Sequence, residues 1–300
     1  MNQMSKALAQ MVEDTRKETA KARQETPLAE LKSRIKDAPP LISFHDSVAS
    51  QFCLIAEVKQ CSPSMGHMNQ ENVRLAPEIY RDSSIVKGIS VLTNSAHFGP
   101  EMSLQRLRSI KLTTGKPVLR KDFITDDYEV YQARAHGADA ILLMANVLEK
   151  DELARLHDTA RELGMDVLFE THTQDEIEQV PKSAKIYGIN CRSFNSEGKT
   201  FALSRFLGNW FGSRKDLTID YSKFDYCKSL PAQSLKIAES GVKPDRCRSV
   251  QAAGFNAILV GTSLLIGPKS IRQVMSEFEA AILGLPQATP SCCAQAQPMN

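Results

Sequence analysis

Charged and amide side chains recur in this 300-residue sequence at one kind of position, close to the end of a short apolar run. Glu57 and Lys59 end the first run, and because they are two residues apart their side chains share one face of a strand. Similar groups follow later runs: Arg120, Lys121, Asp122, Glu170, Asn190, Arg192 and Glu239. Lysines and carboxylates gathered in one cavity shift each other's pKa values apart, as general acid and base catalysis requires. One such residue alone is equally consistent with a solvated strand end, but so many together favour a shared site.

Two segments near the C-terminal end have the composition of an anion-binding site. The first contains Ser240 and Gly241, and the second contains Gly261 and Thr262. The glycines let the backbone approach a ligand closely, and the hydroxyl groups are additional hydrogen-bond donors. Either segment alone is a weak signal, so its meaning depends on the fold around it.

Eight short strand-like runs alternate with amphipathic helical stretches. The runs are Cys53–Val58, Gly88–Leu92, Pro117–Leu119, Ala138–Met144, Asp166–Phe169, Lys185–Ile189, Leu235–Ala238 and Ala257–Val260. Helical patterns such as Asp126–Ala135 and Asp151–Leu163 lie between them, each followed by a glycine suited to the left-handed position after a helix, Gly137 and Gly164. Regular alternation of strand and helix implies parallel strands with right-handed crossovers.

This order predicts an α/β protein with a closed (β/α)8 fold, a TIM barrel. An open doubly wound sheet is the alternative, but the first junction, EVKQCSPSMG, lacks the GxGxxG of a dinucleotide site. In a barrel the charged residues would meet at the C-terminal ends of the strands, where active sites form. The segments after strands seven and eight would then occupy the usual phosphate-binding loops.

Three regions are expected along the chain. Thr26 and Pro27 are typical of an N-cap and a first helical position, before a helix that ends ahead of Pro39. Residues 1–50 are therefore predicted to be an N-terminal helical extension, and residues 51–285 the barrel. The tail, residues 286–300, lacks apolar periodicity and is predicted to be disordered.

Composition excludes several classes of partner and site. The 37 basic and 35 acidic residues give a net charge of +2, which argues against a nucleic-acid or membrane-surface partner. There is no signal-peptide pattern and no long apolar span, so we expect a cytoplasmic protein. The seven cysteines are scattered and the six histidines are isolated, which predicts reduced thiols and no metal site.

Several motifs are similar to those of the indole-3-glycerol-phosphate synthase family. They are IAEVKQCSPSMG, SVLTNSAHFG, PVLRKDFITDDYEVYQARAHGADAILLM, ARELGMDVLFETH, YGINCRSF, KIAESGV and AILVGTSLL. The resemblance covers residues 26–285. It implies a carboxy-lyase of tryptophan biosynthesis that converts a sugar phosphate, 1-(2-carboxyphenylamino)-1-deoxyribulose 5-phosphate, to indole-3-glycerol phosphate with loss of carbon dioxide and water. It also implies that no cofactor is needed.

The same resemblance implies catalytic roles. Lys121 would be the general acid that protonates the ribulose carbonyl while the aromatic ring carbon attacks it. Glu57 and Lys59 would form a neighbouring acid/base and orienting pair, and Glu170 would move protons in the later dehydration. The resemblance leaves open which carboxylate performs which transfer. The other residues it adds to the catalytic set are Asn190 and Glu239.

Substrate contacts also follow from the resemblance. Phe98 would form an apolar wall against the aromatic ring. Asn190 would hydrogen-bond the sugar hydroxyls, and Arg192 and Glu239 would shape the local charge. Ser62 and Ser64 would contact the substrate near its anthranilate carboxylate. The phosphate would be held by Ser240, Gly241, Gly261 and Thr262.

Two other functions compete with this interpretation. A phosphoribosylanthranilate isomerase would share the fold and the phosphate loops, but its reaction does not call for the EVK and LRKDF motifs together. A catalytically inactive barrel could instead bind a partner through residues 195–231, a segment longer than the family norm. A paralogue that serves a specialised indole pathway also stays open. Because the family includes monomers, we expect a monomer with a small-molecule partner.

Overall fold

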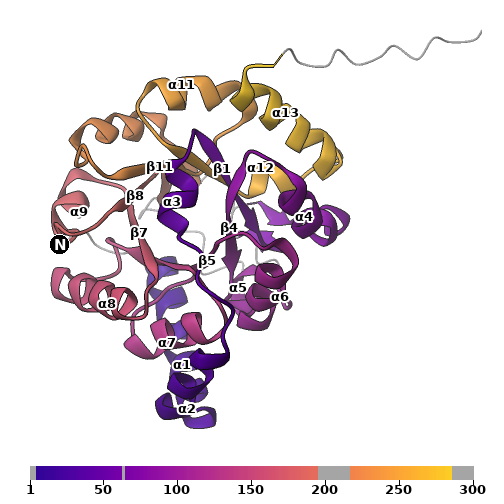
Figure 1. Cartoon of the computed structure of the whole chain (residues 1–300). Coiled ribbons are helices and arrows are strands. Elements are labelled where there is room, and N and C mark those ends of the chain that lie inside the picture. Colours follow the sequence, from indigo (N-terminus) through magenta and orange to yellow (C-terminus); the bar gives the residue numbers. More distant parts are fainter. Residues whose placement is uncertain (1–4, 63–64, 195–216, 286–300) are drawn as a thin grey trace, which may run out of the picture.

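Eight parallel strands close into a barrel in the computed structural model, which describes residues 5–62, 65–194 and 217–285 (Figure 1). The strands are β1 (Cys53–Val58), β4 (Val86–Leu92), β5 (Val118–Lys121), β6 (Ala140–Met144), β7 (Asp166–Thr171), β8 (Ile186–Asn190), β11 (Leu235–Glu239) and β12 (Ala257–Val260). Each pairs in parallel with its neighbours, and β1 closes the ring against β12 and β4. The predicted (β/α)8 barrel and its eight strands are confirmed.

Helices surround the barrel, so most strand residues are buried on both faces and read as continuous apolar runs. The outer elements are α4 (Gln70–Asp82), α5 (Ser95–Phe98), α6 (Leu104–Thr114), α7 (Asp127–Ala135), α8 (Lys150–Glu162), α9 (Gln174–Gln179), α11 (Cys247–Ala252), α12 (Thr262–Leu265), α13 (Ile271–Leu283), and the 3-10 segments η2 (Tyr221–Ser229) and η3 (Pro244–Arg246). Two hairpins lie outside the barrel: β2 (Cys61–Ser62) with β3 (Gly66–His67), and β9 (Arg192–Phe194) with β10 (Leu217–Ile219).

The ends of α7 show how local sequence sets the elements. Asp126 caps the helix by accepting from the Tyr128 amide, and Glu129 completes a capping box. Gly137, two residues past the last helical residue, has a φ of 92°, a conformation that costs glycine little. The helix is therefore bounded as predicted, one residue shorter at its start.

The N-terminal segment forms α1 (Lys6–Glu25), α2 (Leu28–Arg34), the 3-10 turn η1 (Ile35–Asp37) and α3 (Phe44–Ala49). Thr26 is not the N-cap that we predicted, because it ends α1 and its amide donates to the Ala22 carbonyl. Pro27 takes the N-cap position of α2 without a side-chain hydrogen bond. The chain thus turns at Thr26 between two helices rather than entering a helix there.

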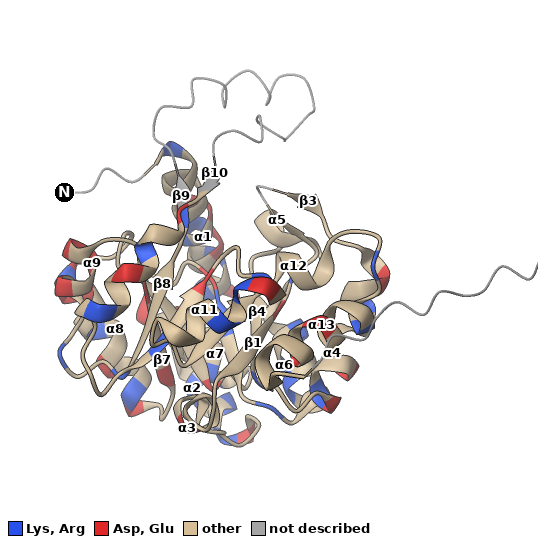
Figure 2. Cartoon of the chain, turned by 90° about the horizontal axis from the view of Figure 1, so that it is seen from above, with Lys and Arg blue, Asp and Glu red and all other residues tan. Residues whose placement is uncertain are grey.

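This extension reaches both ends of the barrel. α3 lies at the N-terminal end of the strands, where the buried ring of Phe44 would collide with any side chain placed at Gly88. α1 lies nearer the other end (Figure 2), where Leu8 and Met11 join the cluster that contains Phe123. The extension therefore closes the lower end and covers one side of the mouth.

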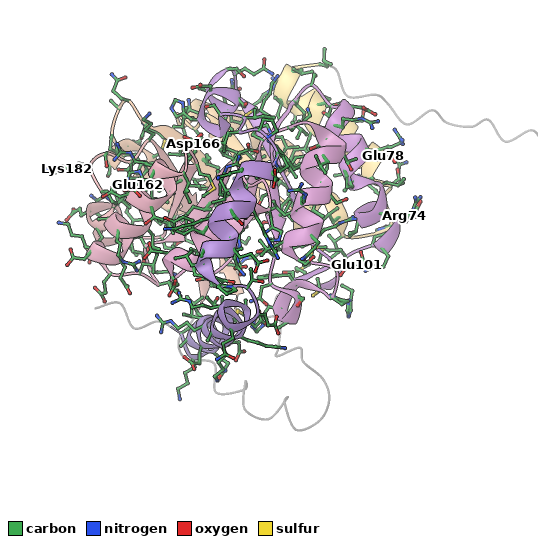
Figure 3. All side chains as sticks on the ribbon, turned by 60° about the horizontal axis from the view of Figure 1, so that its bottom comes forward. Arg74, Glu78, Glu101, Glu162, Asp166 and Lys182 are labelled. Atoms are coloured by element: carbon green, nitrogen blue, oxygen red, sulfur yellow. The ribbon has the colours of Figure 1, made fainter. Side chains whose placement is uncertain are left out.

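The outer surface carries solvated charges, as the side chains of Arg74, Glu78, Glu162 and Lys182 show (Figure 3). Inside the mouth, by contrast, Glu57, Lys59, Glu170 and Glu239 are buried. Among the described helices, none combines the length and the apolar character needed to cross a bilayer. The buried charges are the feature that requires an explanation, since an unpaired buried charge is costly.

Candidate active site

The Glu57 and Lys59 pair at the end of β1 is the first part of the site. Lys59 Nζ donates to Glu57 Oε1 at 2.5 Å, so the two side chains share a face as predicted. Burial would raise the pKa of Glu57, but the nearby Lys59 and Lys121 outweigh burial and lower it. The pKa of Lys59 is also lowered, because burial together with Arg192 and Lys121 outweighs the attraction of Glu57. Lys59 is therefore a better proton donor than an exposed lysine.

Lys121 at the end of β5 is the centre of the site. Its Nζ donates to Glu170 Oε2 at 2.8 Å and to Glu239 Oε2 at 3.1 Å. Asn190 completes the group by donating from Nδ2 to Glu170 Oε1 at 2.9 Å. These side chains come from β5, β7, β8 and β11, so closure of the barrel brings together the strand ends that the sequence pattern singled out.

The three central groups have strongly shifted pKa values. Burial would lower the pKa of Lys121, but the carboxylates of Glu170 and Glu239 outweigh it and raise the pKa. Burial would raise the pKa of Glu170, yet Lys121 and His172 hold it at about 2. Burial and the charge of Glu170 raise the pKa of Glu239 to about 7, in spite of Lys121. One carboxyl is thus firmly ionised and the other changes its charge near neutral pH.

Arg120 and Asp122 do not belong to this group. They flank Lys121, so in an extended strand their side chains point to its other face. Arg120 donates to Asp122 Oδ2 at 3.0 Å, to the Thr93 hydroxyl at 3.1 Å and to the Glu129 carbonyl at 2.8 Å. These two charges fix the loop behind the site, and the inclusion of both among the converging residues was wrong.

Arg192 lies just after β8, beside the carboxylates. Its amide donates to Asn190 Oδ1 at 2.9 Å, which holds the Asn190 side chain with its Nδ2 toward Glu170. Burial lowers the pKa of Arg192 although Glu57 and Glu170 raise it. The half-buried Arg192 is therefore a further cationic group near Glu57 and Glu170, in addition to the two lysines.

The predicted phosphate loops contain a strained backbone and an unpartnered hydroxyl. Ser240 has a φ of 70° and is the one non-glycine residue with a positive φ in the part of the chain that the structure describes; Gly241 follows at 74°. Such strain concentrates at binding sites. Thr262 Oγ1, at the start of α12, is buried without a hydrogen-bond partner. Tyr221 Oη donates to the Gly241 carbonyl at 2.8 Å and anchors the first loop.

Gly261 has a second function that the sequence did not reveal. A Cβ at this position would overlap the carboxylate of Glu57. In the same way, a Cβ at Gly188 would overlap the carboxylate of Glu239. Both glycines therefore make room for a buried carboxylate, in addition to any contact that Gly261 makes with a ligand.

The aromatic wall is larger than predicted. Phe98, at the end of α5, stacks with Phe123 with ring centroids 6.4 Å apart. Phe123 was missed, although an aromatic residue two positions after Lys121 was a usable signal. Ser62 is buried in β2 beside the mouth, whereas Ser64 lies outside the described residues.

His172 was also missed. It follows Glu170 by two residues, the same spacing as Glu57 and Lys59, and its buried ring approaches Glu170 Oε1 with Nε2 at 3.6 Å. Its Nδ1 lies 3.1 Å from Glu176 Oε2. The spacing rule that found the first pair would have found this one.

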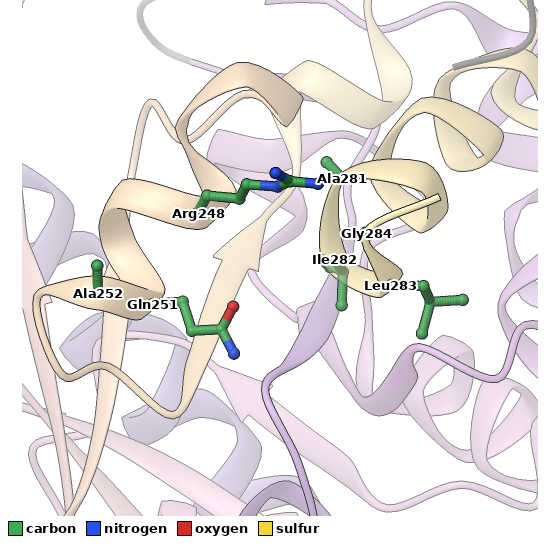
Figure 4. Close-up of a pocket in the computed structure, with 7 residues that line it drawn as sticks. All are labelled: Arg248, Gln251, Ala252, Ala281, Ile282, Leu283 and Gly284. Atoms are coloured by element: carbon green, nitrogen blue, oxygen red, sulfur yellow. The ribbon is translucent and has the colours of Figure 1, made fainter. Parts of the chain in front are cut away.

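A further pocket lies on the outside of the barrel between α11 and α13 (Figure 4). Its polar lining residues are Arg248 and Gln251, and Ile282 and Leu283 provide much of its apolar lining. No carboxylate lines it, so no acid/base pair forms there. Within the described ranges no three histidine, cysteine or acidic side chains form a metal-binding group. The group formed by Lys59, Lys121 and their carboxylate partners therefore marks the barrel mouth as the candidate active site.

Comparison with known proteins shows the family of this chain. The family model described as indole-3-glycerol phosphate synthase matches residues 8–201. The chain belongs to the indole-3-glycerol phosphate synthase family. A member from Paenarthrobacter aurescens (strain TC1) is 39% identical over 264 residues, which cover 85% of this chain and 88% of the relative. Another, from Bacteroides thetaiotaomicron, is 31% identical over 271 residues, 89% of this chain and 95% of the relative.

Solved structures of more distant proteins share the fold with this family member. A 3-keto-L-gulonate-6-phosphate decarboxylase from Vibrio cholerae aligns with a TM-score of 0.55 and 13% identity, over 79% of this chain and 99% of that one. A 3-hexulose-6-phosphate synthase aligns with a TM-score of 0.53 and 17% identity, over 77% and 100%. At these identities the likeness concerns the barrel alone.

Proposed function

We propose that this chain is a carboxy-lyase that converts 1-(2-carboxyphenylamino)-1-deoxyribulose 5-phosphate to indole-3-glycerol phosphate. The observation that carries the proposal is the position of Lys121, half-buried and hydrogen-bonded to both Glu170 and Glu239 in the same mouth as the Lys59 and Glu57 pair. Family membership narrows the many reactions that barrels catalyse to this one.

The reaction requires a fixed number of proton transfers, and the side chains of the mouth can perform them. The ring carbon attacks the ribulose carbonyl, whose oxygen takes a first proton, and carbon dioxide then leaves as the ring becomes aromatic again. The new hydroxyl takes a second proton and departs as water, while the carbon next to the nitrogen loses one. Two acids and one base are needed. Lys121 supplies the first proton, Lys59 the second, and Glu170 accepts the third.

The order of these steps explains how a carboxylate with so low a pKa becomes a base. In the resting site the charge of Lys121 keeps the pKa of Glu170 at about 2. Once Lys121 has given its proton to the carbonyl oxygen, it is neutral and no longer stabilises the ionised carboxylate. Glu170 thus gains basicity only after ring closure, when elimination requires it.

Different side chains of the mouth would bind the two ends of the substrate. Phe98 and Phe123 provide an aromatic surface for the anthranilate ring. On the other side, the strained Ser240 backbone and the unpartnered Thr262 hydroxyl support a phosphate site. Arg192 and Asn190 lie beside the carboxylates and suit the sugar oxygens between these two ends.

The test is to incubate the purified protein with the carboxyphenylamino-deoxyribulose phosphate and to follow indole fluorescence. We expect product from the wild type, and a kcat lower by roughly 10²- to 10⁴-fold in Lys121→Met, because a general acid contributes about that much. Lys182→Met is the matched control, since Lys182 lies on the outer surface. No product from the folded wild type would refute the proposal and favour another phosphate-binding barrel reaction or an inactive paralogue.

A further inference from the structure

His172 is a buried imidazole that the proposed reaction does not use. It stands immediately after β7 with 7% of its surface exposed. Its amide donates to Glu176 Oε2 at 2.6 Å, and its Nδ1 lies 3.1 Å from the same oxygen. Its Nε2 is buried, has no hydrogen-bond partner and lies 3.6 Å from Glu170 Oε1. The ring is thus fixed from one side and directed at the catalytic carboxylate on the other.

The contact with Glu176 determines where the ring proton lies. A carboxylate oxygen accepts hydrogen bonds, so Nδ1 is the nitrogen that carries a proton toward Glu176. Nε2 then either carries a second proton or presents a lone pair. A lone pair facing an ionised Glu170 would be repelled, whereas a proton on Nε2 attracts it. Ionised Glu170 therefore favours a charged His172 ring, and protonated Glu170 favours a neutral ring.

We propose that His172 is a positioning residue that shares a proton with Glu170 across the gap between Nε2 and Oε1. This contact, together with the Asn190 amide on Oε1, holds Glu170 with Oε2 toward Lys121 and the reacting carbon. The other charged groups facing the pair are Glu176 from α9, Lys121 from β5, Glu239 from β11 and Arg192 after β8. At Oε1 itself, Asn190 Nδ2 lies at 2.9 Å and His172 Nε2 at 3.6 Å.

The catalytic consequence rests on the proposed function. In the elimination the C–H bond next to the nitrogen breaks, its electron pair forms the ring double bond, and the proton forms an O–H bond on Glu170 Oε2. The neighbouring C–O bond breaks, and its oxygen leaves as water with a proton from Lys59. A positive His172 ring at Oε1 then lowers the affinity of Glu170 for the proton that it has accepted. It thereby promotes release of this proton before the next turnover.

The first test needs no turnover, so it is independent of the proposed function. In the intact protein with ¹⁵N-labelled histidine, the His172 ring signals are assigned by their absence from His172→Gln. We expect Nδ1 to carry a proton, and the Nε2 signal at pH 7 to respond to the charge of Glu170. In Glu170→Gln that signal should move toward the position of an unprotonated ring nitrogen, because the attracting carboxylate is gone. His45→Gln, which changes a half-buried histidine on α3 at the opposite end of the barrel, should leave the signal unchanged. An Nε2 signal that is the same in Glu170→Gln and in the wild type would overturn the proposal.

The second test is kinetic. His172→Gln should lower kcat roughly tenfold with KM changed less than twofold, and should move the acidic limb of the kcat profile up by about one pH unit. A purely structural role would lower the melting temperature and raise KM but leave the pH profile in place, which would also overturn the proposal. If Glu170→Gln moves the His172 Nε2 signal while the wild type makes no indole product, the proposed function is refuted and the proposal for His172 is supported.

Discussion

Glu239 is the carboxyl group of the mouth whose charge changes near neutral pH. Its pKa is raised from an ordinary value of 4.5 to about 7. Between these two pH values the folded protein holds a proton that the unfolded chain has released, so the free energy of unfolding falls as pH rises through this window. Glu170 behaves oppositely: its pKa of about 2 stabilises the fold at neutral pH, and that contribution is lost as pH falls below 4.5.

Glu239→Gln tests the first of these effects. Relative to the wild type, the variant should gain roughly 1 to 3 kcal/mol of unfolding free energy as pH rises from 5 to 8, because it has no carboxyl to ionise. Urea denaturation of both proteins at the two pH values measures the difference. Glu78→Gln, on the outer face of α4, is the control and should track the wild type. A difference that is constant with pH would contradict the raised pKa.

Gly188→Ala tests the close approach of a carboxylate to the backbone. The added Cβ overlaps the Glu239 carboxylate, and overpacking of this kind costs about 1 to 3 kcal/mol. In Gly188→Ala/Glu239→Ala the collision is absent, so the double variant should lose less stability than the sum of the two single changes. The unfolding free energies of the wild type, the two single variants and the double variant are measured by denaturation. If the losses of the single variants add up to that of the double variant, Gly188 is required for another reason.

Much of this site could be predicted because its residues follow apolar runs, and the mouth of a parallel barrel collects such positions. The direction in which each side chain points was harder to predict. Arg120 and Asp122 are charged and lie at the same strand end as Lys121, and only the strand pleat separates them from it. Thr26 has the composition of an N-cap, but the helix before it already occupies that turn. Sequence patterns predict where a residue lies more readily than which way it faces.

At the scale of elements, the segment before β11 supports the loop that we propose to bind phosphate. Asp220 donates its amide to the Cys191 carbonyl at 2.9 Å, and Tyr221 donates its hydroxyl to the Gly241 carbonyl at 2.8 Å. The side chain of Ile219 lies where a Cβ at Gly241 would be. The described part of this long segment therefore packs on the loop at Gly241, which the sequence did not indicate.

Tyr221→Phe measures the value of that support. Loss of the hydroxyl removes one hydrogen bond worth about 1 kcal/mol, so kcat/KM should fall roughly fivefold, through KM, if the Gly241 loop binds the phosphate. Tyr131→Phe, on α7 away from the loop, is the matched control. An unchanged KM in Tyr221→Phe would separate this segment from substrate binding.

For the whole molecule, the pattern of exposed apolar side chains bears on assembly. The large apolar residues exposed in the described chain are scattered over different elements: Leu28, Leu41, Met65, Leu112, Ile219, Leu283 and Leu285. Stable dimers usually need a continuous apolar patch. We therefore predict a monomer, with a light-scattering mass near 33.2 kDa after size exclusion. A mass twice as large at micromolar concentration would contradict this.

The contact between Gly261 and Glu57 links the catalytic site to the seam of the barrel. β1 is the first strand of the ring and β12 the last, and they pair directly at this point. During synthesis the ribosome releases β1 long before β12 exists, so the Glu57 carboxylate cannot yet be enclosed. The candidate active site is thus completed by the last strand to emerge. A chain truncated before β12 would expose the carboxylates of the mouth to water instead of holding them at their shifted pKa values.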